Sequence, residues 1–181
     1  MDSLMNIDIE LLRFIQVNRY EVLDQFLYFI SFFTTYINLG LILSVLIISL
    51  YRKSKPLRMA FYKLAVVFIV AALISFALKN MIVRDRPFVT YPDIEKLSEA
   101  GSFSFPSGHT LETFAIVMAI SIAFPKKKII IPLLCWALLV GYSRMALGVH
   151  YPGDVIGGMI IGAAIGWMVP LIFKSHRTPV R

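Results

Sequence analysis

The chain has 181 residues, of which 58% are hydrophobic, and its mean hydropathy is +0.75. A soluble domain is nearer half apolar, so these values exclude an ordinary soluble enzyme and indicate one membrane domain over residues 1–181. The net charge of +7 does not predict a nucleic-acid partner, because the lysines and arginines cluster in short loops between apolar runs. The one cysteine, Cys135, lies inside an apolar run, which excludes an internal disulfide and a cysteine metal site.

The N-terminal segment, residues 1–25, is charged. Residues 2–24 hold five acids and two arginines before any long apolar run, so the segment does not resemble a secretory signal. Residues 8–17 place apolar side chains on one helical face and Asp8, Glu10 and Arg13 on the other. This run is too short and too charged to cross a bilayer, and it predicts an amphipathic helix in the membrane interface. A helix packed on the bundle is an equally open alternative.

Five long apolar runs follow within residues 26–173. The first, residues 26–50, contains no charged residue, and at ~1.5 Å per residue it is long enough to cross a hydrocarbon layer of ~30 Å. The pattern predicts an all-α integral membrane bundle of five to six transmembrane helices, followed by a basic tail at residues 174–181. The remaining runs are residues 59–83, 109–124, 129–149 and 155–173.

The last run carries Gly158, Gly162 and Gly166 at intervals of four residues. Small residues at this spacing form one smooth helical face, which predicts close contact with another helix. The partner helix can belong to the same chain or to another subunit, so the oligomeric state stays open.

The basic residues are distributed unevenly over the two sides of the membrane. With five spans, the loops 51–58 and 125–128 share one side with the C-terminal tail, and all three are rich in Lys and Arg. The positive-inside rule makes this side cytoplasmic. The loops 84–108 and 150–154 then face the opposite side together.

Three polar stretches stand where apolar runs meet these two outer loops. A lone cation at a helix end commonly reaches the interface without further function, but three of them near two histidines predict one phosphate site. Lys79 and Arg86 would share a helical face if the helix continued to Arg86. The stretches are Lys79 with Arg86-Pro87, Phe105-Pro106-Ser107-Gly108-His109-Thr110, and Ser143-Arg144 with His150 and Asp154.

The stretch around His109 is typical of a helix start. Ser107 can cap the helix, Gly108 allows a ligand to approach the backbone, and the free N–H groups of the first turn favour an anion. A capped helix with a surface histidine is the alternative for this stretch alone.

His150 and Asp154 are four residues apart. Asp154 can accept a hydrogen bond from one ring nitrogen of His150, which leaves the other nitrogen free to attack. His109 would then donate a proton to the leaving oxygen, while Lys79 and the arginines stabilise the phosphoryl charge. A metal site formed by His109, Glu112, His150 and Asp154 is a weaker alternative, because the nearby cations would oppose a divalent ion.

As a set, these motifs resemble the three signature motifs of the type 2 phosphatidic acid phosphatase (PAP2) family, over roughly residues 60–170. The resemblance implies a helical bundle and a metal-independent phosphatase that needs no cofactor and works through a phosphohistidine. It implies His150 as nucleophile, Asp154 as its orienting carboxylate and His109 as general acid. The phosphate-binding residues that it implies are Lys79, Arg86, Ser107, Gly108 and Arg144.

Two charged residues lie outside the signature. Glu112, one turn after His109, could meet the head group or form an ion pair with Lys79 or Arg144. Arg84 could contact the head group, although an interface anchor is the favoured interpretation.

The expected partners are the bilayer and a lipid phosphate, and the expected location is a bacterial inner membrane with the site facing outward. The favoured substrate is undecaprenyl diphosphate, with lipid A and phosphatidylglycerophosphate as alternatives. A non-catalytic binder or transporter of anionic lipids, and a histidine-based metal transporter, are the competing hypotheses. The His150–Asp154 pair together with His109 distinguishes an enzyme from a binder, which needs neither.

Overall fold

The protein is a helical bundle in the computed structural model, which describes residues 2–173. No strand occurs within this part of the chain, so the all-α prediction is confirmed. The predicted basic tail, residues 174–181, lies outside the described residues. The helices are α1 (Asp2–Val17), the single 3₁₀ turn η1 (Glu21–Leu23), α2 (Asp24–Tyr51), α3 (Lys55–Ile82), α4 (Pro87–Thr90), α5 (Gly108–Ala123), α6 (Lys127–Ala146) and α7 (Pro152–Ile172).

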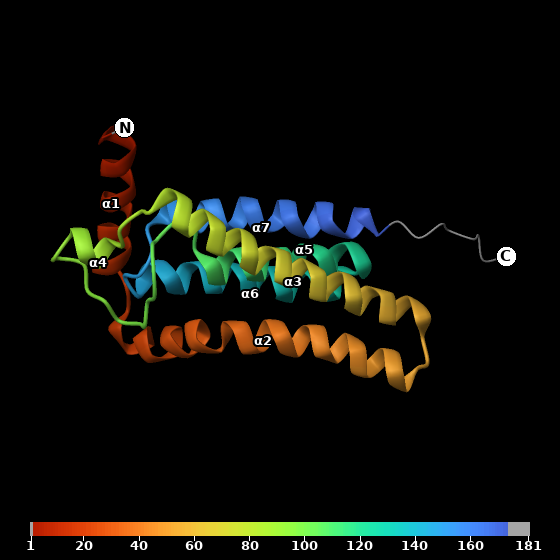
Figure 1. Ribbon diagram of the computed structural model, residues 1–181. Helices are drawn as coiled ribbons and strands as arrows, with labels where there is room; N and C mark the ends of the chain where they lie inside the picture. The colour runs from red at the N-terminus through yellow and green to blue at the C-terminus, as the bar shows by residue number, and fades with distance from the viewer. Residues whose placement is uncertain (1, 174–181) are drawn as a thin grey trace.

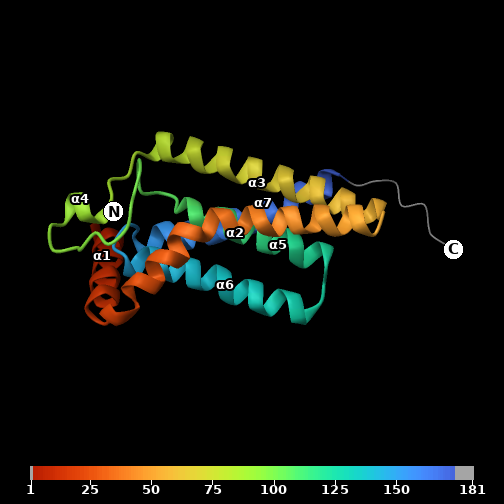
Figure 2. The ribbon, with the colours of Figure 1, turned by 90° about the horizontal axis from the view of Figure 1, so that it is seen from below.

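Helix α5 occupies the centre of the bundle and contacts α2, α3, α6 and α7. Figures 1 and 2 show these five helices running alongside one another. The four outer helices are long and apolar enough to cross a membrane, whereas α5 has 16 residues and is only about 24 Å long. Because its neighbours cover it, α5 need not meet lipid along its whole length. The predicted five-helix bundle is therefore present, with one short helix inside it.

The core forms where α3, α5 and α7 meet. Leu64 and Val67 of α3 and Leu111 and Ile116 of α5 are almost completely buried within one apolar cluster. The interior is apolar, as in a soluble protein. The outer surface differs, because large apolar side chains of the outer helices are exposed there. Such a surface suits a hydrocarbon environment.

The glycine face of α7 packs against α5. A Cβ atom at Gly158 would lie 2.9 Å from the carbonyl oxygen of Ser107, and one at Gly162 would lie 2.2 Å from that of Leu111. Gly166 meets the carbonyl of Ala115 in the same way. The predicted close helix contact is thus internal to the chain, and it brings the start of α7 beside the start of α5.

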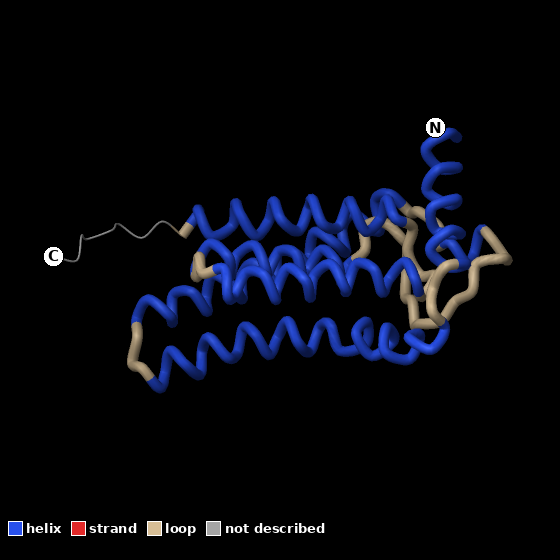
Figure 3. Tube along the Cα trace, turned by 180° about the vertical axis from the view of Figure 1, so that it is seen from behind, coloured by secondary structure: helices blue, strands red, loops and turns tan. Residues whose placement is uncertain are grey.

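The connections gather at the two ends of the bundle. Figure 3 shows the long loop between α3 and α5 and the turn between α6 and α7 at the end where α1 lies. The α2–α3 and α5–α6 connections lie at the other end, as the loop count predicted. The condition under which Lys79 and Arg86 would share a helical face, a helix that continues to Arg86, is not met. The helix ends at Ile82, and Val83 adopts a left-handed conformation with φ of 51°.

Helix α1 lies across the end of the bundle (Figures 1 and 2) and contacts α6 and α7. Its Ile9 and Leu12 are buried in a cluster with Ile94 and Tyr151, so packing on the bundle is the correct alternative for this segment. The opposite face is also apolar and exposed, because Ile7, Leu11 and Phe14 lie on it. Contact of that face with the membrane interface stays a prediction.

The contact between α5 and α7 makes a test of the fold possible. Substitution Gly162→Ala places a methyl group within overlap of a backbone carbonyl and is expected to destabilise the protein by about 1–3 kcal/mol. Gly40→Ala is the control, because a Cβ there meets nothing within 4 Å, and its effect is expected to stay within about 1 kcal/mol. Unfolding in detergent micelles measures both. Equal stabilities would contradict the internal helix contact.

Candidate active site

A polar cavity of about 250 Å³ opens at the end of the bundle nearest α1. It lies between α2, α3 and α5, with part of the α3–α5 loop over it. The sequence motifs converge here although they come from three separate parts of the chain. The predicted site residues that line it are Lys79, Arg86, Gly108, His109, Glu112, Arg144 and His150.

His150 is held between a carboxylate and a guanidinium group. Its Nδ1 lies 3.5 Å from Oδ2 of Asp154, and its Nε2 lies 3.3 Å from a terminal nitrogen of Arg86. Arginine can only donate hydrogen bonds, so Nε2 is the acceptor and the proton belongs on Nδ1. In this tautomer the lone pair of Nε2 is directed at Arg86, on the side of the ring that borders the cavity.

The ionisation of His150 favours the neutral ring. Burial is the main reason that the pKa of His150 is lowered to about 3, and the charges of Arg144 and Arg86 act in the same direction, against the opposing effect of Asp154. The imidazole is therefore unprotonated at neutral pH. A neutral imidazole is the form that can act as a nucleophile.

Asp154 is buried and fully bonded. One carboxylate oxygen accepts hydrogen bonds from the Ser104 hydroxyl and from the Tyr151 backbone N–H, the latter at 3.0 Å. The other oxygen accepts from Arg84 at 2.7 Å. The carboxylate is thus fixed on the side of the ring that faces away from the cavity, as the sequence predicted for an orienting group.

The three cations are positioned by oxygen atoms around the cavity. Lys79 donates to the carbonyl of Phe103 at 2.6 Å, and Arg86 donates to the carbonyls of Ser102 and Val149, each at 2.7 Å. Arg144 donates to the Ser31 hydroxyl. The Nε of Arg144 is buried without a hydrogen-bond partner among residues 2–173. An arginine side chain stays protonated in proteins, so these guanidinium groups keep their charge.

The start of α5 borders the cavity through Gly108 and His109. Ser107 is the N-cap residue, but its side chain does not cap the helix and instead pairs with the Thr110 hydroxyl at 2.8 Å. The predicted side-chain cap is therefore wrong. The first-turn N–H groups remain available to an anion. Gly108 also lies close to α3, because a Cβ atom there would be only 3.2 Å from the Ser75 hydroxyl.

The two residues left open by sequence reasoning have different surroundings. Glu112 lines the cavity and forms no ion pair with a cation of the described chain, so the proposed pairs with Lys79 and Arg144 are absent there. Arg84 is not a free interface anchor, because it bonds Asp154 and Asp8. Within residues 2–173, no three His, Cys, Asp or Glu side chains are grouped to hold a metal ion.

Comparison with known proteins identifies this arrangement. Residues 60–177 match the sequence profile of the PAP2 superfamily. The chain belongs to the PAP2 superfamily. It is an integral membrane lipid phosphatase, and the resemblance seen in the sequence is confirmed.

Three PAP2 relatives illustrate the similarity. The chain is 32% identical to the undecaprenyl-diphosphatase BcrC of Bacillus subtilis over 82% of this chain and 74% of that protein. It is 37% identical to the lipid A 4'-phosphatase of Bacteroides thetaiotaomicron, over 45% of this chain and 35% of that protein. The crystal structure of a transmembrane PAP2-type phosphatidylglycerolphosphate phosphatase from Bacillus subtilis superposes with a TM-score of 0.81 at 27% identity, covering 98% of this chain and 90% of that chain.

Some residues around the PAP2 site could not be found from the motifs. Ser104 hydrogen-bonds Asp154 from the α3–α5 loop, and Ser31 of α2 hydrogen-bonds Arg144. Single serines in a loop or an apolar helix carry no recognisable pattern. Asp8 lies outside the residues matched to the superfamily, and only its place on the polar face of α1 marked it.

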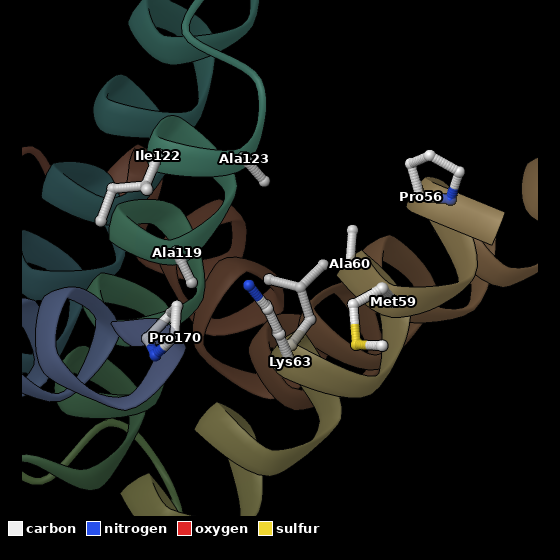
Figure 4. Close-up of a pocket in the computed structure, with 9 residues that line it drawn as sticks. Pro56, Met59, Ala60, Lys63, Ala119, Ile122, Ala123 and Pro170 are labelled. Atoms are coloured by element: carbon white, nitrogen blue, oxygen red, sulfur yellow. The ribbon is translucent and has the colours of Figure 1, made fainter. Parts of the chain in front are cut away.

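Another cavity, of about 300 Å³, lies near the opposite end of the bundle. Figure 4 shows Lys63 of α3 reaching toward Ala119 of α5 and Pro170 of α7 there. None of the PAP2 motif residues lines this cavity. The motif chemistry is therefore confined to the cavity beside α1.

The fixed position of Asp154 predicts the effect of removing its charge. Asp154→Asn is expected to lower kcat by about 10²- to 10⁴-fold, because an amide cannot hold the Nδ1 proton of His150 as a carboxylate does. Steady-state phosphate release measures the loss, and gel filtration in detergent checks that the variant is folded. A folded variant with near wild-type kcat would remove Asp154 from the mechanism.

Proposed function

We propose that this PAP2 phosphatase hydrolyses the terminal phosphate of a lipid phosphate or diphosphate through a phosphohistidine on His150. The observation that carries the proposal is the orientation of His150. Its Nδ1 faces Asp154, while its Nε2 faces Arg86 and the cavity lined by Lys79, Arg144 and His109. A nucleophile, a proton donor and phosphate-binding cations therefore share one space.

The reaction has two balanced steps. In the first, Nε2 of His150 attacks phosphorus, the bond between phosphorus and the leaving oxygen breaks, and His109 gives that oxygen a proton. In the second, a water molecule gives a proton to His109 and attacks phosphorus. The P–N bond breaks, inorganic phosphate leaves, and His150 returns to its neutral form.

The cations stabilise the transferred group. A phosphoryl group in transfer spreads its charge over three oxygens, which favours donors placed on several sides. Lys79, Arg86 and Arg144 approach from α3, the following loop and α6. The unpaired Nε of Arg144 and the first-turn N–H groups of α5 add donors that the protein itself does not use. Ser107 is buried and does not border the cavity, and its hydroxyl pairs with that of Thr110 in the same turn.

The substrate we favour is undecaprenyl diphosphate, with lipid A and phosphatidylglycerophosphate as alternatives. The relatives named above include phosphatases for each of these lipids. The cavity also reaches Thr35 of α2 and Ser75 of α3 between two membrane-crossing helices. A lipid tail can remain in the bilayer there while its phosphate meets the cations.

We propose further that residues 1–181 act as one catalytic domain in a bacterial inner membrane. The basic loops at residues 51–58 and 125–128 lie at the end of the bundle opposite the cavity. The positive-inside rule then directs the active site to the outer side. Labelling of single cysteines placed in loops at the two ends tests this orientation.

The test of the function is phosphate release by detergent-purified protein in excess EDTA. The panel contains undecaprenyl diphosphate, phosphatidylglycerophosphate, phosphatidic acid and lipid A. We expect release to persist in EDTA and to be lost in His150→Ala, and the fastest substrate identifies the preferred lipid. Release that survives His150→Ala on every lipid would exclude the phosphohistidine mechanism.

Glu112 provides a separate prediction about substrate choice. Its carboxylate shares the cavity with the incoming phosphate and has no ion-pair partner in the described chain. At pH 8 it should repel a diphosphate more than a monophosphate. Glu112→Gln is therefore expected to lower KM for the diphosphate by about threefold or more relative to the monophosphate.

The matched control for this change is Glu99→Gln. Glu99 borders the same cavity but is exposed to solvent, which screens its charge. Its effect on the ratio of the two KM values should be smaller than that of Glu112→Gln. An unchanged ratio in both variants would show that Glu112 does not affect the choice between the two substrates.

A further inference from the structure

We propose that Asp8 of α1 is a positioning residue for the His150 nucleophile and acts through Arg84 and Asp154. This inference rests on the function proposed above and extends it to a helix that the superfamily match does not include. The match begins at residue 60, whereas Asp8 lies in the N-terminal helix.

The side chains form a continuous chain of contacts. Asp8 accepts a hydrogen bond from one terminal nitrogen of Arg84 at 2.6 Å. The other terminal nitrogen of Arg84 donates to Asp154 at 2.7 Å. Asp154 in turn lies 3.5 Å from Nδ1 of His150 through its second oxygen. One planar guanidinium group therefore bridges two carboxylates, and its orientation depends on both.

Asp8 also holds the backbone next to Asp154. Its second carboxylate oxygen accepts the N–H of Gly153 at 2.7 Å, in the first turn of α7. The approach is close, because a Cβ atom at Gly153 would lie 2.9 Å from the Asp8 carboxylate. A carboxylate at a helix N-terminus is stabilised by free N–H groups and the helix dipole. Asp8 thus fixes Asp154 both through its side-chain partner and through its backbone neighbour.

Burial makes this pairing more than a surface ion pair. The side chains of Asp8, Arg84 and Asp154 are 13%, 22% and 0% exposed. The guanidinium of Arg84 also lies 3.9 Å from the centre of the Tyr151 ring, which restricts its movement. Exposed ion pairs contribute little, whereas removal of one partner from a buried network leaves an uncompensated charge.

The loss of Asp8 would free one end of Arg84. The guanidinium would then keep a single carboxylate partner and could rotate about its long side chain. Such a rotation would shift the Asp154 oxygen that Arg84 binds and tilt the carboxylate, because Ser104 and the Tyr151 N–H hold only the other oxygen. Because a misplacement of about 1 Å can cost roughly 10²-fold in rate, a small shift is sufficient to affect attack by His150.

The attachment of α1 does not depend on Asp8 alone. Arg13 of the same helix pairs with Asp93 at 2.8 Å, and Gln16 bonds the carbonyl of Glu95 at 2.9 Å. Ile9 and Leu12 contribute buried apolar contacts. Removal of the Asp8 charge should therefore leave the helix in place, and the Arg13–Asp93 pair supplies a matched control.

The experiment compares Asp8→Asn with Asp93→Asn in the full chain. Each change replaces a carboxylate that pairs with an arginine and joins α1 to the rest of the protein. Only Asp8 is connected to Asp154. For Asp8→Asn we expect kcat to fall about 10- to 100-fold with KM within about twofold of wild type. For Asp93→Asn we expect kcat to stay within about twofold.

Arg84→Gln provides the second comparison. If both residues act along one path, Asp8→Asn on the Arg84→Gln background should cause little further loss, so the two effects are not additive. Independent multiplication of the two losses would argue against a shared path. Equal kcat values for Asp8→Asn and Asp93→Asn, or a change confined to KM, would overturn the inference.

Two further variants distinguish a folding defect of Asp8→Asn, an incorrect role for Asp8 and an incorrect function for the site. If Asp8→Asn does not fold, Asp8→Glu keeps the charge but moves it by one methylene. A lower kcat at wild-type KM then supports positioning, and wild-type kcat overturns it. His150→Ala, assayed in parallel, tests the underlying function. Activity that survives in it rejects the phosphohistidine proposal, whereas its loss together with a fully active Asp8→Asn rejects only the role of Asp8.

Discussion

The buried carboxylate of Asp154 is the constraint on which the rest of the site depends. A charge with no exposure to water is costly unless it is paired and hydrogen-bonded. Here Arg84, Ser104 and the Tyr151 N–H supply its partners. These partners come from the α3–α5 loop and the start of α7, so the loop must fold against α7 before His150 can be oriented.

The packing of α5 against α7 determines how far apart the two histidines of the site lie. His109 is the second residue of α5, and His150 lies two residues before Pro152, the first residue of α7. The glycine face of α7 allows its backbone to approach the carbonyls of α5, and this approach fixes the separation of the two histidines. Larger residues on that face would move His109 away from His150 without touching either. The glycine face that predicted close helix packing therefore also sets the position of His109 relative to His150.

The sequence pointed to site residues whose side chains are charged or ionisable and therefore rare in apolar helices. It could not point to site residues of types that are common in loops and helices. Lys79, Arg144 and His150 are costly in an apolar setting, so their presence indicated a site. Ser104 is ordinary in a loop and could be found only in space. Whether α3 continues to Arg86 could not be decided from the sequence, because no local pattern marks the left-handed conformation that Val83 takes after the helix ends. For α1, apolar side chains on one face and charged side chains on the other fit both a helix in the membrane interface and a helix packed on the bundle, so the pattern left its environment undecided.

The four cations around the two histidines fall into two electrostatic groups. Arg84 is neutralised by Asp8 and Asp154 on the far side of His150. In contrast, Lys79 and Arg86 hydrogen-bond backbone carbonyls and Arg144 a hydroxyl group, which orient them without cancelling their charge. If Arg84 were absent, Asp154 would be compensated by the cavity cations instead, and their attraction for a phosphate would weaken. The Arg84 pairing therefore keeps the positive charge of the cavity available to a phosphate while it holds the carboxylate that faces His150.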